Sequence, residues 1–486
     1  MKTGFARFTR DSAVFAMGAV AGKAIGFLLL PIVTRFLGPE DFGRFDLLAT
    51  LGSALITILL LGFDAAVVRL YFLPSDSAHR GRLMATWFVI AAVIVIPVAV
   101  VLVALAGPLS SVLFGTTAYA SAIALTAVVL VAGTFQYLVL TALRVAGRAP
   151  AYAIVSAGTL ALNAVLVVVI LGTTDTGVAG AILAYAVSLT AAALIGGAII
   201  RSQFFDDAEG PSGRNLGRPS TSVMSRIAHL GLPLAIPVAL VWVAEVVDRL
   251  ILLAVNGPAE VGYFSVAVRY ASVAGLVVGG FQLAWLPRAY DLGSSRPALV
   301  RLGSDGRRIV IIVSAAAAVV ALVAPEAIAL LAGDLFIDAL AAAGPALAAN
   351  IGIALFLVVS LPSALAAAMR EVAVATAVGV VATVAATFLL AGPAGAFGAA
   401  TALLLGQLVA VAVAGLYGRR HAAPAVAWPR TLAFAGVATV VIIIATSPVG
   451  ASLVVRGLAG AGMLVVMFFE GTLADAARWA REQVGG

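Results

Sequence analysis

Long apolar runs separated by short polar connections make up most of the chain, and each run extends for about 18–28 residues. A helix of that length crosses a hydrocarbon core of about 30 Å. Membrane-spanning strands would instead appear as alternating segments of about ten residues. The pattern therefore predicts an all-α polytopic membrane protein with about fourteen spans, at residues 12–36, 45–71, 83–106, 119–142, 150–172, 178–200, 229–254, 262–286, 309–332, 342–368, 372–390, 395–417, 430–446 and 452–470.

A short turn sequence occurs twice, each time between two apolar runs. Residues 38–45 read Gly-Pro-Glu-Asp-Phe-Gly-Arg-Phe, and residues 257–264 read Gly-Pro-Ala-Glu-Val-Gly-Tyr-Phe. Both copies fit the pattern Gly-Pro-x-acid-apolar-Gly-x-Phe. Internal repetition of this kind predicts two related halves.

The connection at residues 201–228 is long, polar and rich in Gly, Ser and Pro, which is typical of a linker. It separates spans 1–6 from spans 7–12, and because six is even, both halves enter the membrane from the same side. The halves are therefore expected to be parallel repeats, related by an axis along the membrane normal. We expect an N-lobe at residues 1–200, the cytoplasmic loop at 201–228, a C-lobe at 229–417, and two appended spans with a cytoplasmic tail at 418–486.

Composition and charge strengthen this picture and give it an orientation. The chain is 63% hydrophobic and only 10% charged, against about 25% charged in soluble domains. Of its 29 Lys and Arg residues, 22 fall in every second connection or at the termini, and the opposite connections hold only Arg44. The positive-inside rule then predicts a multi-pass protein of the cytoplasmic (inner) membrane with both termini in the cytoplasm. The same excess accounts for the net charge of +7 without a nucleic-acid partner.

Recognised catalytic patterns are missing from the sequence. It contains no Walker A sequence, no Gly-x-Ser-x-Gly nucleophile motif, no His-Glu-x-x-His metal motif and no cysteine. We therefore expect neither an enzyme nor a bound cofactor or metal.

The candidate chemistry lies in ionisable residues inside the spans. Each costs about 2.5–3.5 kcal/mol at a helix centre, so such residues usually face a partner or a watery cavity. Lys23 lies near the middle of span 1, too deep to reach the surface easily. Span 2 carries a polar stripe at helical spacing that predicts a cavity-lining face five turns long, formed by Asp46, Thr50, Ser53, Thr57 and Asp64.

In span 7, Glu245, Asp248 and Arg249 share one face, and Arg269 in span 8 sits at a similar depth and could partner them. A purely structural alternative is an ion pair that holds spans 7 and 8 together. Arg69 has its own alternative, in which its side chain simply extends to the inner interface. Three residues near outer helix ends are expected to reach water: Arg35, Glu326 and Arg456. Weaker polar candidates inside spans are Gln136, Tyr137, Asn163, Gln282, Asn350 and Gln407.

The stretch from Leu28 to Tyr71 resembles the polysaccharide transporter and O-antigen flippase family. It contains the first Gly-Pro turn and then, at residues 62–71, Gly-Phe-Asp-Ala-Ala-Val-Val-Arg-Leu-Tyr. The second half carries matching pieces: Gly-Leu-Pro-Leu at 231–234, Asp-Arg-Leu-Ile-Leu at 248–252 and Gly-Tyr-Phe-Ser-Val-Ala at 262–267. The family is part of the multidrug/oligosaccharidyl-lipid/polysaccharide exporter superfamily, which includes multidrug exporters and lipid II flippases.

This resemblance implies two six-helix lobes in a V shape that open alternately to either side of the membrane. Such proteins move a lipid-linked oligosaccharide, typically on undecaprenyl pyrophosphate, to the outer leaflet for cell-surface polysaccharide biosynthesis. The pyrophosphate would need a cationic cavity, and the substrate-binding candidates are Lys23, Arg269, Asp64, Arg69 and Arg249. Glu245 and Asp248 are candidates for ion coupling or for structural ion pairs. Expected partners are the lipid-linked glycan and membrane lipids, together with a glycan polymerase and glycosyltransferases.

Two alternatives stay open on the sequence alone. The intramembrane acids would also suit a proton- or sodium-coupled exporter of small molecules with the same fold. A membrane scaffold in a glycan-assembly complex would use the same charges only for structure.

Overall fold

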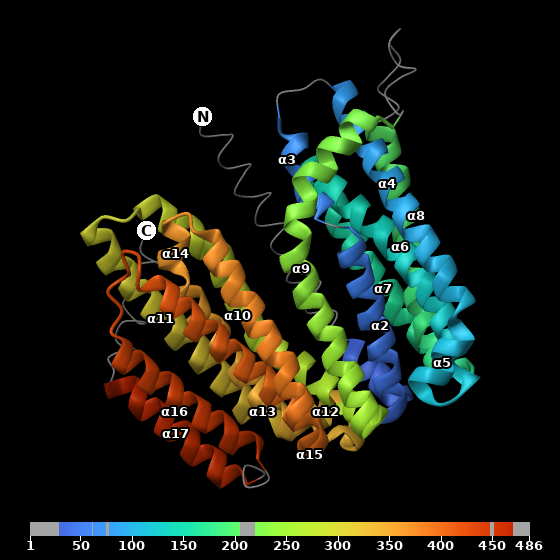
Figure 1. Cartoon of the computed structure of the whole chain (residues 1–486). Helices are drawn as coiled ribbons and strands as arrows, with labels where there is room; N and C mark the ends of the chain where they lie inside the picture. Colours follow the sequence, from blue (N-terminus) through green and yellow to red (C-terminus); the bar gives the residue numbers. More distant parts are fainter. Residues whose placement is uncertain (1–28, 61, 74–76, 205–218, 448–451, 470–486) are drawn as a thin grey trace. The chain divides into compact units, whose positions relative to one another are not determined.

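The computed structural model describes residues 29–60, 62–73, 77–204, 219–447 and 452–469, and these residues form helices and short connections without any strand. The prediction of an all-α membrane protein is confirmed (Figure 1). The helices are α2 (Pro39–Leu59), α3 (Phe63–Tyr71), α4 (Ser77–Ala104), α5 (Ala106–Phe114), α6 (Ala120–Val145), α7 (Ala149–Thr173), α8 (Gly177–Phe204), α9 (Thr221–Asn256), α10 (Pro258–Leu292), α11 (Arg296–Leu322), α12 (Ala324–Ala332), α13 (Ala339–Val359), α14 (Leu361–Leu365), α15 (Met369–Gly418), α16 (Trp428–Thr446) and α17 (Leu453–Phe469), with 3-10 turns η1 (Thr117–Tyr119) and η3 (Asp334–Phe336).

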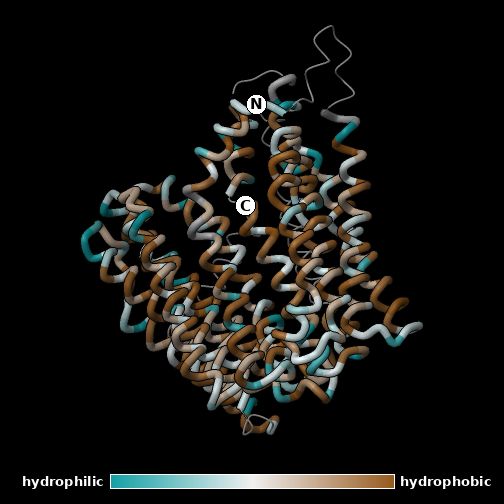
Figure 2. The backbone as a smooth tube through the Cα atoms, turned by 45° about the vertical axis from the view of Figure 1, so that its right-hand side comes forward, coloured by the Kyte–Doolittle hydropathy of each residue, from teal (hydrophilic) through white to brown (hydrophobic). Residues whose placement is uncertain are grey.

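The observed helices follow the predicted spans closely. Within the described residues, nine helices are long and apolar enough to cross a membrane, and the bent pair α11 and α12 would make a tenth. In Figure 2 the brown of apolar residues covers most of the length of the helices. Predicted spans 11 and 12 form one 50-residue helix, α15, interrupted at Gly395, where φ is 51° and ψ is −135°. Most of predicted span 1 lies outside the described residues, and its last part, residues 29–36, is helical.

Span 2 departs from the prediction because it is not one continuous helix. α2 ends at Leu59, Gly62 adopts a left-handed conformation with φ of 67°, and α3 starts at Phe63. Glycine lacks a Cβ atom and therefore takes this conformation without a steric cost. The expected five-turn stripe thus stops at Thr57, and Asp64 belongs to a separate short helix.

The chain divides into two compact units, Met1–Leu250 and Ile251–Gly486. In the first unit α6 is the central helix and packs against α2, α4, α7 and α8. In the second unit α13 takes the central position and packs against α10, α11, α15 and α16. Helix α9 belongs to the first unit up to Leu250. The predicted lobe boundaries at residues 200 and 229 remain a prediction.

The two units contain the same sequence of local structures. In each, a long helix is followed by a nine-residue helix and a 3-10 turn before the central helix: α4, α5, η1 and α6 in the first, and α11, α12, η3 and α13 in the second. The backbone conformation after the central helix is also repeated in the two units. Gly147 has φ of 69° before α7, and Ala367 has φ of 57° before α15. A hydrogen bond from Arg148 N to Leu143 O matches one from Ala368 N to Ser363 O.

The repeated Gly-Pro turn has an acidic residue whose partner is also repeated. Glu260 accepts a 2.7 Å hydrogen bond from Ala396 N, just after the break in α15. Its counterpart Asp41 lies at the start of α8, where a Cβ atom added to Gly177 would be 3.8 Å from Asp41 Oδ2. Both glycines at these helix starts, Gly177 and Gly395, have φ near 50°. A carboxylate is favourable at a helix N-terminus because the first amide groups there lack intrahelical acceptors.

The appended helices α16 and α17 are held to the second unit by polar contacts as well as by packing. Ala425 N, just before α16, donates to Leu299 O of α11 at 3.2 Å. Arg456 of α17 donates to Glu326 of α12 and, at 2.8 Å, to Leu322 O at the end of α11. The expectation that Arg456 reaches water was wrong, since its side chain is only 6% exposed, whereas Glu326 is 58% exposed. The 63° bend between α11 and α12 leaves Leu322 O available as an acceptor.

Candidate functional site

A buried ion pair joins α2 to α9. Arg249 Nε lies 2.9 Å from Asp46 Oδ2, and the side chains of Arg249 and Asp46 are 7% and 2% exposed. Arg249 Nη1 also donates to the backbone oxygen of Glu245, one turn earlier in α9, at 2.9 Å. The guanidinium is therefore fixed from two directions, by a carboxylate of another helix and by a carbonyl of its own.

Two further carboxyl groups of α9 interact electrostatically with the same guanidinium. Glu245 and Asp248 share the helix face of Arg249, as their spacing predicts, and both attract it electrostatically together with Asp46. Asp248 is almost fully buried and Glu245 is partly exposed. Ionised groups in this setting are stabilised only by close partners, because the surrounding apolar helices replace water poorly. We call these four residues the α2–α9 charge cluster.

The polar stripe on α2 continues from Asp46 through hydroxyl groups that are bonded within their own helix. Ser53 Oγ donates to Ala49 O at 2.9 Å, and Thr57 Oγ1 donates to Ser53 O at 3.1 Å. Both residues are partly buried, as is Thr50. Such bonds lower the free-energy cost of placing a hydroxyl group in an apolar setting. The stripe is therefore compatible with a buried helix face as well as with one that lines a water-filled cavity.

Asp64 has a partner that its sequence position did not reveal. Tyr137 of α6 donates its hydroxyl hydrogen to Asp64 Oδ2 at 2.7 Å, so this bond ties α3 to the central helix of the unit. The neighbouring Gln136 donates to Thr159 Oγ1 of α7 at 3.1 Å. Two weak polar candidates of span 4 therefore connect α6 to two other helices.

Two of the remaining predicted site residues, Arg69 and Arg269, lie among the described residues. Arg69, near the end of α3, is exposed, as expected for a side chain that extends to an interface. Arg269 is partly buried in α10, within the second unit, and its backbone oxygen accepts from Ser272 Oγ at 2.6 Å. Lys23 lies outside the described residues.

The pairing of Asp46 with Arg249 was missed from the sequence, although a usable signal was present. Asp46 is seven residues from the start of α2 at Pro39, and Arg249 is seven residues from the end of α9 at Asn256. Both helix ends adjoin connections that the charge pattern predicts to lie outside, which would put the two charges about 10 Å deep at 1.5 Å per residue. Matching depth and opposite sign are what an intramembrane pair requires.

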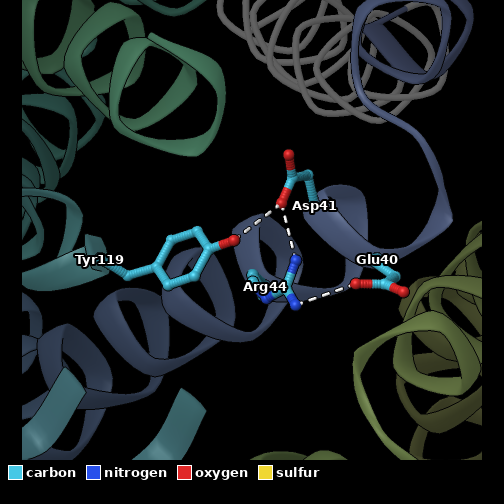
Figure 3. Close-up of polar contacts among 4 residues, drawn as sticks. All are labelled: Glu40, Asp41, Arg44 and Tyr119. Atoms are coloured by element: carbon cyan, nitrogen blue, oxygen red, sulfur yellow. Dashed lines mark hydrogen bonds and ion pairs between the residues drawn. The ribbon is translucent and has the colours of Figure 1, made fainter. Parts of the chain in front are cut away.

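A second polar cluster lies at the start of α2 and is shown in Figure 3. Arg44 contacts Asp41 at 2.8 Å and Glu40 at 3.0 Å, and Tyr119 donates to Asp41 Oδ1 at 3.2 Å. The Arg44 guanidinium also lies 4.8 Å from the centre of the Tyr119 ring. Arg44 is the one basic residue predicted for the outer connections, and two adjacent acids neutralise it. This cluster joins the repeated turn to the start of α6 and acts as a structural contact.

A model of a protein family described as "Polysaccharide biosynthesis protein" matches residues 8–292, which include α2, α9 and most of the contacts described above. The chain belongs to this family. The resemblance seen in the Gly-Pro turns is thus confirmed, and the polysaccharide biosynthesis family model extends to the end of α10.

Solved structures of transporters share the fold of this polysaccharide biosynthesis family member. "Lipid II flippase MurJ, inward closed conformation" aligns with a TM-score of 0.71 and 11% identity, over 96% of this chain and 99% of that one. An inward-facing multidrug resistance MATE family transporter of the MOP superfamily aligns with a TM-score of 0.64 and 17% identity, over 82% and 94%. A MOP superfamily transporter from Pyrococcus furiosus, whose binding pocket is described as having reverse polarity, aligns with a TM-score of 0.52 and 17% identity, over 85% and 95%. At these identities the likeness establishes the fold alone.

One curated relative is similar over a short stretch. An uncharacterized membrane protein of Haemophilus influenzae (strain ATCC 51907 / DSM 11121 / KW20 / Rd) is 33% identical over 63 residues. That stretch spans 13% of this chain and 16% of the relative.

Proposed function

We propose that this protein is a flippase that moves a polyprenyl-pyrophosphate-linked oligosaccharide across the cytoplasmic membrane for cell-surface polysaccharide biosynthesis. The observation that carries the proposal is membership of the polysaccharide biosynthesis family in a chain with the fold of flippases and exporters. The cargo is amphipathic and anionic, so its pyrophosphate must pass a region where water is scarce. Cationic side chains inside spans are suited to that passage, because hydrogen bonds between charged groups are among the strongest in proteins.

Alternating access requires no covalent chemistry, and we assign the protein no catalytic residue. In the proposed mechanism Lys23 and Arg269 attract the pyrophosphate, and Arg249 exchanges Asp46 for a phosphate oxygen during the cycle. The hydrogen bonds to Asp46 and to Glu245 O stabilise the Arg249 guanidinium when no substrate is present. The exchange gives the Arg249 guanidinium one anionic partner in place of another, and it leaves Asp46 without its partner during that step.

Removal of the Lys23 charge tests the proposal directly. We expect Lys23→Ala to insert and fold but to stop glycan export, because the pyrophosphate then loses a cationic partner near the middle of span 1. Lys23→Arg should retain part of the activity. The measurement is complementation of a glycan-export defect, with membrane levels of each variant determined in parallel.

Arg201→Ala serves as the matched control, since Arg201 is exposed in the last turn of α8. It removes one positive charge from the arginine-rich side without touching the proposed path, and export should be normal. Normal export by a well-expressed Lys23→Ala protein would remove the central assignment of this mechanism.

The second candidate is an ion-coupled small-molecule exporter, and the carboxyl groups on α3 and α9 favour it together with the MATE fold neighbours. It predicts the opposite order of effects. Asp64→Asn or Glu245→Gln would abolish transport, because a coupling ion or proton needs a carboxylate, while Lys23→Ala would be tolerated. The same complementation assay, with these two variants included, separates the two functions. For the flippase we further propose a glycan polymerase and glycosyltransferases as partners.

A further inference from the structure

The hairpin between α10 and α11 concentrates positive charge outside the residues assigned to transport. Between Arg288 and Arg308 the chain carries five arginines and two aspartates. Arg288 Nε and Nη2 lie 2.9 and 2.8 Å from Asp305 Oδ2, and Arg308 Nη1 lies 3.7 Å from Asp305 Oδ1. One carboxylate thus holds two guanidinium groups from two helices close together.

The two arginines are fixed but remain accessible. The side chains of Arg288 and Arg308 are 58% and 52% exposed, whereas Asp305 between them is 18% exposed. Arg301 lies one turn before Asp305 and is exposed as well. We call Arg288, Arg301, Asp305 and Arg308 the hairpin arginine patch. It has an excess of two positive charges and presents guanidinium donors that the aspartate does not occupy.

The exposed face of α11 changes character just beyond this patch. At 100° per residue, Arg301 and Arg308 share a face with Ile312, Val319 and Val323. The exposed fractions of these three apolar side chains are 47%, 61% and 52%. An exposed stripe that is basic up to Arg308 and apolar from Ile312 onward fits a helix that passes from the headgroup layer into the hydrocarbon core.

We propose that the hairpin arginine patch binds the phosphate of an anionic phospholipid, with an acyl chain lying along Ile312 and Val319. Arginine is suited to phosphate because its planar fork donates two parallel hydrogen bonds. A basic cluster directly beside the end of a membrane span also attracts anionic lipids. The apolar continuation of the stripe selects a lipid over a free phosphate, because only a lipid can occupy both parts. None of the patch residues is among those proposed to bind the glycan.

Native mass spectrometry of the purified full-length protein with added phosphatidylglycerol or phosphatidylcholine tests the proposal. We expect the wild type to retain phosphatidylglycerol preferentially. The double variant Arg288→Gln/Arg308→Gln should bind it less tightly by roughly fivefold for each arginine removed. The matched control is Arg419→Gln/Arg420→Gln, which removes the same charge from two exposed residues at the end of α15. That control should bind as the wild type does.

Asp305→Asn distinguishes a built site from a diffuse positive surface. It adds net positive charge, so simple attraction would strengthen phosphatidylglycerol binding. A patch organised by Asp305 would lose its geometry and bind more weakly, which is the result we expect. Equal losses in the two double variants, or stronger binding by Asp305→Asn, would overturn the proposal. Displacement of the lipid by millimolar inorganic phosphate would overturn it too, because the ligand would then be a free phosphate.

Discussion

The Asp46–Arg249 pair lies in a setting where either charge alone would be costly. Both side chains are buried, and the helices around them are apolar. Loss of one partner leaves an uncompensated charge, whereas exchange of the two keeps opposite signs in contact. Substitutions in this pair therefore test whether the ion pair holds α2 and α9 together.

We expect Asp46→Asn to destabilise the detergent-purified protein by about 3–5 kcal/mol, the usual effect of breaking a buried ion pair. The reversed pair, Asp46→Arg with Arg249→Asp, should recover part of that loss. Thermal unfolding of both variants measures the difference. A reversed pair as unstable as the sum of its single variants would show that the contact contributes no stability.

At this scale the sequence predicted which polar residues share a helix face, but it did not predict their partners on other helices. Glu245, Asp248 and Arg249 were placed on one face by helical spacing alone, and the structure has all three in one continuous helix, α9. Asp46 and Tyr137 were recognised as polar positions, but their partners are on helices distant in sequence. Periodicity describes one helix at a time, so it carries no information on which faces of different helices meet.

The acidic residue of the repeated turn gives the last span of each half a defined start. Glu260 bonds to Ala396 N, and Asp41 approaches Gly177. In both places a glycine with positive φ opens the helix. This arrangement explains why both copies of the turn carry an acid at the same position.

Gly395→Ala should destabilise the second unit. The left-handed backbone alone costs an alanine roughly 1–2 kcal/mol, and its Cβ atom would also clash with Glu260 Oε2. Gly197→Ala in α8 is the control, because no atom lies within 4 Å of its Cβ position. That substitution should be neutral or slightly stabilising, since alanine favours helices more than glycine does. Melting temperatures of the two variants check the contrast, and equal values would contradict the assigned role of Gly395.

Arg456 connects the appended α17 to the bend between α11 and α12. We expect Arg456→Ala to destabilise this attachment by about 1–2 kcal/mol, the lower part of the range for hydrogen bonds to charged groups, because Glu326 is half exposed. Limited proteolysis at the connection between α15 and α16 should become faster. Arg456→Lys keeps the charge but has a single donor group, and should give an intermediate rate. An unchanged rate for Arg456→Ala would mean that packing alone holds the appended helices.

Helix positions were predicted well because each span needs a long apolar run, which hydropathy reports directly. Two of the breaks were not predicted. Gly62 interrupts span 2 and Ala367 adopts a left-handed conformation, yet neither interrupts the hydropathy pattern. Glycine and alanine are both common within membrane helices, so their identity alone does not mark an end.

For the whole molecule, the distribution of basic residues makes a prediction about topology. Reporters fused after Arg214 and at the C-terminus should report the cytoplasm, and a reporter at Asp175 should report the outside. A fusion series with a phosphatase and a fluorescent protein measures this. An external C-terminus would exclude the expected fourteen spans.

The repeated order of long helix, short helix, 3-10 turn and central helix supports the two related halves inferred from the Gly-Pro turns. The sequence revealed the repeat only where glycine, proline and an acid are needed together. Apolar side chains can replace one another inside membrane helices. Most equivalent positions of the two halves therefore have no identical residue.

The contact between Glu260 and Ala396 also has a consequence for biogenesis. Its two ends are separated by 136 residues, which a ribosome adding 5–20 residues per second completes in about 7–27 seconds. Throughout that interval the Glu260 carboxylate has been synthesised, but the Ala396 amide group that will donate to it has not. The second half therefore remains incomplete in the membrane until its last helix has been synthesised and inserted. We expect chains arrested within this window to be the preferred substrates of membrane proteases, and chains released after it to be resistant.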